Sequence, residues 1–142
     1  MNDEFTTKAL IMTAVKWIVL PMAVLFLLML YSIRSEAGEF WTGDKVADTL
    51  MVSANMLIVM DWAQTRESSD KGYEEVGAAK NFIGRYPTTG DVNRYFIASL
   101  IQYNMVNYLL PTKLKKVYSG FTAAIEFSVV KGNYEIGVGM KF

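Results

Sequence analysis

The chain has 142 residues and a mass of 16.0 kDa, which suits one small domain. Apolar residues make up 52% of it and the mean hydropathy is +0.20, so the average residue is more apolar than in most soluble domains. The 14 basic and 14 acidic residues balance, which argues against a nucleic-acid partner. Histidine and cysteine are absent, which excludes disulfides, Cys/His metal sites, thiol nucleophiles and histidine bases. We therefore expect no enzyme, no metal and no cofactor.

The strongest feature is an apolar segment near the N-terminus, at residues 9–33. It contains a single charge, that of Lys16, and as a helix it extends about 37 Å. A hydrocarbon core is about 30 Å thick, so this segment predicts a transmembrane anchor. The preceding tail, residues 1–8, holds Asp3 and Glu4, whereas the start of a signal peptide is basic. This difference favours a retained anchor over a cleaved signal.

Three further apolar runs follow, at residues 46–63, 95–110 and 117–130. With the anchor they predict an all-α membrane protein of about four transmembrane or membrane-embedded helices, with a short extended C-terminal tail. The uncharged part of the second run, between Asp48 and Asp61, is short for a lone membrane helix. The alternative is therefore one N-terminal anchor followed by a small soluble domain, either all-helical or α+β.

Residues 64–94 differ from the apolar runs because they are rich in basic residues and glycine. They predict an extramembrane loop within a helical membrane domain of residues 34–142, with a short helix near residues 73–82. With four crossings, this loop and both termini lie on one side of the membrane, which then carries more basic residues than the other side. The positive-inside rule favours cytoplasmic termini in the inner membrane.

The C-terminal residues allow two interpretations. Apolar residues alternate with small or charged ones over residues 134–142, and this period of two is typical of a strand. A hairpin of residues 121–130 with 134–142 is therefore possible. We favour a helical fourth run followed by an extended tail.

The apolar runs carry polar residues at helical spacing. Asp48, Asn55 and Trp62 recur every seven residues and therefore lie on one helix face. Asn104 and Asn107, three residues apart, share a face of the third run. We expect these stripes to point into a bundle and to pair between helices, where lipid does not reach them.

The densest polar cluster begins at Asp61 and ends at Arg66. Asp61 and Thr65 are four residues apart on one helix face, and the expected topology places Glu126 toward the same side. A carboxylate pair at a bilayer boundary is able to hold a proton or a hard cation. The alternative is a hydrogen-bonded packing cluster with Arg66 or Lys131 as the counter-ion.

The residues Asp61-Trp62-x-Gln64-Thr65, followed by Gly84-x-x-Pro87 and Tyr95-Phe96, form a pattern that resembles small uncharacterised membrane proteins of phages and bacteria. The resemblance covers about residues 50–142 and leaves the anchor outside. The chain departs from the pattern at residues 80–82, where it reads Lys-Asn-Phe and those proteins tend to read Asn-Pro. The resemblance implies a membrane fold and a phage origin, and it implies no activity.

Two classes of function remain. The first is a protein that acts through contacts with the lipid bilayer, with itself or with another membrane protein. Examples are a holin-like lysis factor, a superinfection-exclusion factor and a component of a membrane-anchored assembly. The second is an intramembrane enzyme or ion-handling protein that uses Asp61 and Glu126. The chain has no phosphate loop, nucleophile elbow or metalloprotease motif, which favours the first class.

Overall fold

The structure is a computed structural model that describes residues 38–75 and 79–140. It has three long helices, α2 (Lys45–Asp70), α4 (Thr89–Leu109) and α5 (Thr112–Glu135), and a short helix α3 (Lys80–Ile83). No strand occurs within the described residues, so this part of the chain is all-helical, as predicted. The predicted tail and anchor, residues 1–33, lie outside the described part.

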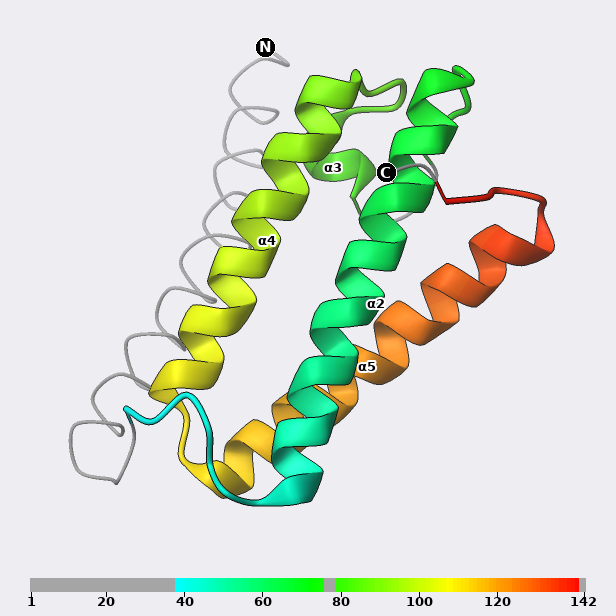
Figure 1. Cartoon of the computed structure of the whole chain (residues 1–142). Helices are drawn as coiled ribbons and strands as arrows, with labels where there is room; N and C mark the ends of the chain where they lie inside the picture. The colour runs from blue at the N-terminus through cyan, green and yellow to red at the C-terminus, as the bar shows by residue number, and fades with distance from the viewer. Residues whose placement is uncertain (1–37, 76–78, 141–142) are drawn as a thin grey trace, which may run out of the picture.

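Helix α2 lies at the centre of the described fold (Figure 1). Helix α4 runs antiparallel beside it, and α5 packs along it more extensively than α4 does. Helices α4 and α5 meet near their connection at Pro111 and then diverge (Figure 1). α4 and α5 therefore both pack on α2, and the distance between them grows away from Pro111.

The connecting segments alternate between the two ends of this arrangement. At one end, Lys116 of α5 forms an ion pair of 2.7 Å with Asp44, which precedes α2. At the other end, Ser69 of α2 donates a hydrogen bond of 2.7 Å to the carbonyl of Pro87, which precedes α4. The predicted topology requires this alternation of ends.

The loop predicted at residues 64–94 is too long. Helix α2 continues to Asp70, α4 begins at Thr89, and the expected short helix is confined to α3. The polar composition after Asp61 was misleading because these polar residues face another helix. Gln64 and Thr65 are buried, and the Gln64 Nε2 donates to the carbonyl of Val130 in α5 at 3.2 Å.

The C-terminal hairpin is also wrong. Helix α5 runs without a break to Glu135, through the first half of the hairpin, residues 121–130, and through residues 131–133 where its turn would lie. It ends where Gly137 adopts a φ of 84°, a conformation that favours glycine, and the N–H of Val138 returns to the carbonyl of Asn133 at 3.0 Å. Residues 138–140, which follow this cap, have no regular secondary structure.

The apolar core is small and lies between α2 and α4. It consists of Met51, Ala54, Ile58, Val92, Phe96 and Tyr103. Trp62 covers one side of it, with its ring stacked on that of Phe96 at 6.3 Å between centroids. The Trp62 Nε1 donates to Asn93 at 2.9 Å, so its polar edge is satisfied on α4. This core fixes α4 against α2, and Tyr118 and Ala123 of α5 pack against it.

Helix α4 begins at a capping box. The Thr88 hydroxyl accepts from the N–H of Asp91, and the Asp91 carboxylate accepts from the N–H of Thr88 at 3.1 Å. The hydrogen bonds from Thr88, with the nearby Arg94, lower the pKa of Asp91 below its ordinary value. The capping box therefore marks the point at which the polar connection ends and α4 begins.

We predict that Thr88→Ala lowers the free energy of unfolding by about 1 kcal/mol, because the first turn of α4 loses its side-chain cap. The same change raises the pKa of Asp91 toward its ordinary value. Unfolding in detergent and carboxyl carbon NMR measure the two effects. Thr112→Ala is the control, because Thr112 starts α5 without a side-chain cap. Equal losses in both variants would contradict the prediction.

Candidate functional site

The predicted amide stripes meet between α2 and α4. Asn55 and Asn104 each donate from Nδ2 to the other's Oδ1, at 3.3 Å and 2.8 Å. Asp48 behaves differently, because its Oδ1 accepts from the N–H and hydroxyl of Thr42, at 3.0 Å and 2.8 Å. It therefore binds the segment that precedes α2, whereas Asn55 pairs two helices as expected.

A buried hydrogen-bonded chain joins α4 to α5. The Tyr103 hydroxyl donates to Ser119 at 2.9 Å, and the Ser119 hydroxyl donates to the Oδ1 of Asn107 at 2.8 Å. The Asn107 Nδ2 donates to the carbonyl of Tyr103 at 3.1 Å. All three side chains are buried, and Ser119 is fully so. The sequence indicated Asn107 as inward-facing but gave no reason to select its partner on α5.

Ser119 belongs to a polar face of α5 that the sequence analysis missed. Its members are Lys115, Ser119, Thr122, Glu126 and Asn133, which recur at intervals of three, four or seven residues. Lys115 is buried and donates to the carbonyl of Glu39. Spacing at the helical period was the available signal, and only the charge of Glu126 had drawn attention to this run.

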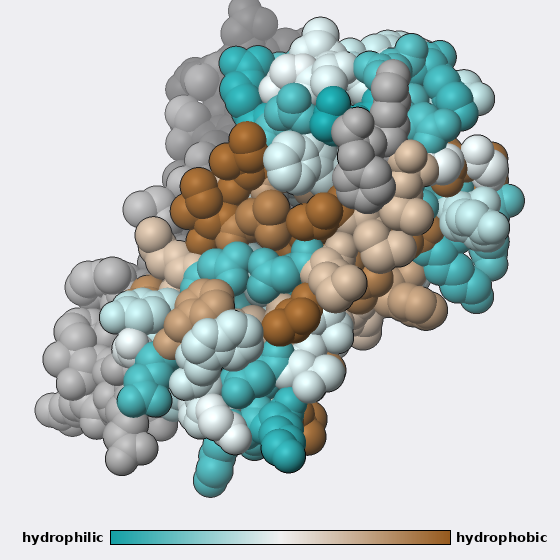
Figure 2. Space-filling model, viewed as in Figure 1, coloured by the Kyte–Doolittle hydropathy of each residue, from teal (hydrophilic) through white to brown (hydrophobic). Residues whose placement is uncertain are grey.

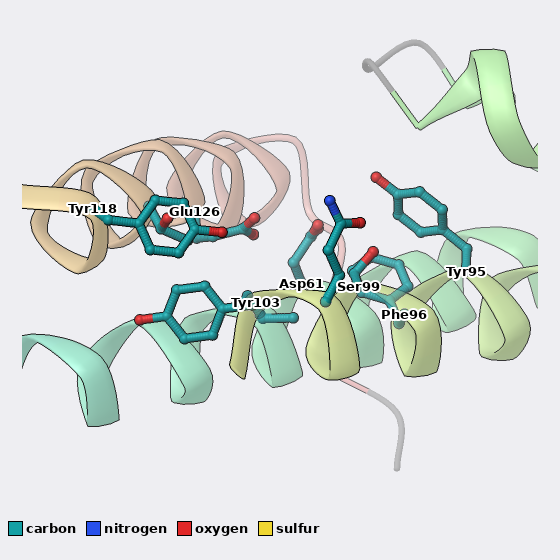
Figure 3. Close-up of a pocket in the computed structure, with 10 residues that line it drawn as sticks. Asp61, Tyr95, Phe96, Ser99, Tyr103, Tyr118 and Glu126 are labelled. Atoms are coloured by element: carbon teal, nitrogen blue, oxygen red, sulfur yellow. The ribbon is translucent and has the colours of Figure 1, made fainter. Parts of the chain in front are cut away.

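A cavity of about 160 Å³ lies between α2, α4 and α5, where the latter two diverge (Figure 3). It is lined by Ile58, Asp61, Tyr95, Phe96, Ser99, Gln102, Tyr103, Tyr118, Thr122 and Glu126. The structure thus brings Asp61 and Glu126 to one cavity, which agrees with their predicted placement toward the same side. It also brings aromatic side chains there that the sequence did not connect with the acids.

The two acids of this cavity are poorly compensated. Asp61 accepts from Thr65 at 3.4 Å and from Asn133 at 3.2 Å. The Oε2 of Glu126 is buried and has no hydrogen-bond partner within the described part of the chain. Among the described residues, no Lys or Arg pairs with either acid, and Lys131 pairs with Glu135 at 3.5 Å. Residues 38–75 and 79–140 therefore supply no counter-ion of the kind that the packing interpretation assumed.

A second cavity, of about 480 Å³, adjoins the first and shares Asp61, Tyr95 and Glu126 with it. Its further lining includes two acids, Glu74 and Glu75, as well as apolar side chains of α5 and the C-terminal tail. Arg85 binds Glu74 at 2.6 Å and lowers the pKa of that carboxyl. Among the described residues, no Lys or Arg lines either cavity.

No known protein family, curated protein or solved structure matches the chain. Among the described helices, α2 is the one long and apolar enough to cross a membrane, by length and composition alone. A core helix of a soluble protein passes the same test. The function therefore has to be inferred from the geometry of the helices and cavities.

We predict that Ser119→Ala lowers the free energy of unfolding by about 1–3 kcal/mol, because it leaves Asn107 and Tyr103 with unpaired buried groups. Thermal unfolding followed by circular dichroism measures the loss. The matched control is Ser128→Ala, the same change at an exposed position of the same helix. The buried chain is unimportant for stability if the two variants unfold at the same temperature.

Proposed function

We propose that the chain is a small integral membrane protein that acts through contacts with lipid and with other membrane proteins or a second copy of itself. The proposed spans are residues 9–33, 46–63, 95–110 and 117–130. The observation that supports this proposal is the distribution of polarity in the described bundle, which buries several polar side chains beside its apolar core and exposes many large apolar side chains.

The interior holds polar side chains at its most buried positions. The largest fully buried side chains are Gln64, Val92, Asn107 and Ser119, and three of these four are polar. Gln64 donates to the carbonyl of Val130 and so joins α2 to α5, and Ser119 donates to Asn107 and so joins α5 to α4. Asn107 also donates to the carbonyl of Tyr103 on its own helix. Interhelical hydrogen bonds of this kind stabilise helix association in lipid, where the hydrophobic effect between helices is lost.

The outer surfaces are apolar. Large exposed apolar side chains follow each long helix at intervals of three or four residues: Val52, Met56 and Val59 on α2; Ile97, Ile101 and Met105 on α4; Leu114, Val117, Phe121 and Ile125 on α5. Phe121 is 67% exposed and Val117 is 68% exposed. Figure 2 shows hydrophobic residues gathered across the middle of one face, with a hydrophilic strip among them and hydrophilic residues at both ends.

The free energy of such an apolar surface differs between water and lipid. Apolar area left in water costs about 25 cal/mol per Å², whereas contact with lipid tails removes this cost. Ion pairs gather near the helix ends, as with Lys116 and Asp44 at one end and Lys71 and Glu67 at the other. Residues 95–112 contain no charged side chain. A bilayer around the middle of the bundle satisfies both features.

We predict that single cysteines divide into two groups when labelled from one side of the membrane. The native chain has no cysteine, so each introduced thiol reports on one position. The four substitutions are Ser35→Cys, Lys71→Cys, Thr112→Cys and Phe142→Cys. With four spans, the thiols at 71 and 142 lie on one side and those at 35 and 112 on the other. Labelling after detergent solubilisation is the control, and all four thiols react there. Four thiols on one side would overturn the four-span proposal in favour of a single anchor.

The resemblance to small membrane proteins of phages and bacteria supports a bacterial membrane as the setting of the proposed function. Expression in bacterial cells separates the contact functions. Abrupt loss of viability with membrane leakage supports a holin-like role. Harmless expression that blocks phage infection supports superinfection exclusion. If neither occurs, a membrane-anchored assembly is the remaining member of this class.

A second candidate function is ion handling by Asp61 and Glu126. It is favoured because both acids line one cavity and neither has a basic partner among the described residues. A cation that enters the cavity offsets the repulsion between the two carboxylates.

We predict that the unfolding temperature in detergent rises when sodium or potassium chloride replaces, at equal ionic strength, a salt whose cation is too large to enter the cavity. This rise is absent in Asp61→Asn, because one of the two carboxylates is lost. Glu135→Gln, which removes an exposed acid of α5, is the control and keeps the rise. If the unfolding temperature of the native chain is the same in both salts, the ion-handling function is ruled out.

A further inference from the structure

We propose that the joined cavities form a binding site for an organic ammonium group, either a protonated amine or a quaternary ammonium. This inference deepens the second candidate function and rests on it. It names the chemical class of cation, and it rests on the charge, the aromatic walls and the sizes of the two cavities.

The charge of the lining selects a cation. Asp61 and Glu126 border both cavities, and Glu75 lies close enough to Asp61 to act on it electrostatically. The described lining contains no basic side chain. The buried Glu126 Oε2 also lacks a hydrogen-bond donor. A buried acceptor of this kind is costly unless a donor or a cation reaches it, and an ammonium group supplies either or both.

The aromatic walls favour an organic cation over a bare metal ion. Figure 3 shows Tyr103 and Tyr118 on one side of Asp61, and Tyr95 and Phe96 on the other. The rings of Tyr103 and Tyr118 stack at 5.5 Å between centroids, and those of Tyr95 and Phe96 meet edge to face at 5.1 Å. Aromatic faces attract ammonium groups through their quadrupoles, and cages of such rings recognise quaternary ammonium ligands.

Metal coordination fits the same lining less well. Hard cations such as Ca²⁺ take about six to eight oxygen ligands. In the described part of the chain, no group of three or more acidic side chains is arranged to hold a metal ion. An ammonium group needs fewer oxygen partners because its charge is spread over its substituents, which pack against rings.

The sizes of the cavities indicate how the ligand divides between them. Pockets for drug-sized ligands measure about 300–1,000 Å³, so the inner cavity of about 160 Å³ suits a small head group. The outer cavity, of about 480 Å³, has Ile125, Val129 and Val138 in its lining. It is therefore able to receive an apolar or mixed chain attached to the head group.

The test is calorimetric titration of the full chain in detergent with choline chloride. The comparison ligand is 3,3-dimethylbutan-1-ol, which has nearly the same shape without the charge. We expect saturable binding of choline that is tighter than any binding of sodium at equal ionic strength, and no binding of the neutral alcohol. No saturable choline binding, or equal binding of the alcohol, would overturn the inference.

Four variants locate the site. Glu126→Gln weakens choline binding roughly tenfold, whereas Glu135→Gln, on the same helix outside both cavities, leaves it unchanged. Tyr118→Leu removes a ring and weakens binding, whereas Tyr118→Phe keeps the ring and the affinity. Circular dichroism confirms that each variant is helical. If Glu126→Gln does not fold, the Tyr118 pair still decides, since equal affinity in both would overturn the inference.

The ammonium group has two possible sources, a free amine or the head group of a lipid such as phosphatidylethanolamine. Both satisfy the proposed chemistry, and nanodiscs distinguish them. A lipid source weakens choline binding in phosphatidylethanolamine discs relative to phosphatidylglycerol discs, because the head group competes. A free-amine source gives equal affinities. The two proposals fail separately. If the native chain does not bind choline but its unfolding temperature still rises with sodium, the ammonium assignment is wrong and the ion-handling function is retained.

Discussion

The packing of α5 along α2 is the contact on which the arrangement of the three long helices depends, and the hydrogen-bonded chain of Tyr103, Ser119 and Asn107 ties α5 to α4 as well. This hydrogen-bonded chain lies where α4 and α5 are close, and the two helices diverge beyond it. The apolar core joins α2 to α4, and Tyr103 belongs both to this core and to the hydrogen-bonded chain. Fixed at one end by polar contacts, α5 leaves space between itself and α4, and the inner cavity occupies that space.

This arrangement connects stability with the proposed function. A bundle in lipid gains little from burying apolar side chains between its helices, because the lipid is equally apolar. Polar contacts such as Asn55 with Asn104 then carry specificity, and the apolar stripes are free to meet lipid or another protein. The same polar interior gives a cavity in which Asp61 and Glu126 face a shared space without a basic partner.

The sequence predicted the helical class and the positions of the three described apolar runs, because those runs are long and end at polar residues. It also predicted that Asn55 and Asn107 turn inward, since their spacing follows the helical period. It misplaced the end of α2, because Gln64 and Thr65 read as loop residues until a facing helix satisfies them. Polarity alone does not show whether a residue meets water or another helix.

The lining of the inner cavity could not be predicted from the sequence either, because it depends on how two helices are placed. Tyr95, Tyr103 and Tyr118 come from two helices, and only the divergence of α4 and α5 brings them around Asp61. One sequence gives no angle between helices. The polar face of α5 was accessible in principle, because Ser119 and Glu126 are seven residues apart on the same face.

The most direct test of the proposal that the bundle is embedded in a membrane is a spin-label scan along α5 in nanodiscs, which measures the accessibility of each label to oxygen and to a water-soluble nickel complex. The account predicts high oxygen and low nickel accessibility at Val117 and Phe121, which lie on the exposed apolar stripe of α5, and low values of both at Ser119. High nickel accessibility along the apolar stripe would contradict the account, since water would then cover the surface assigned to lipid.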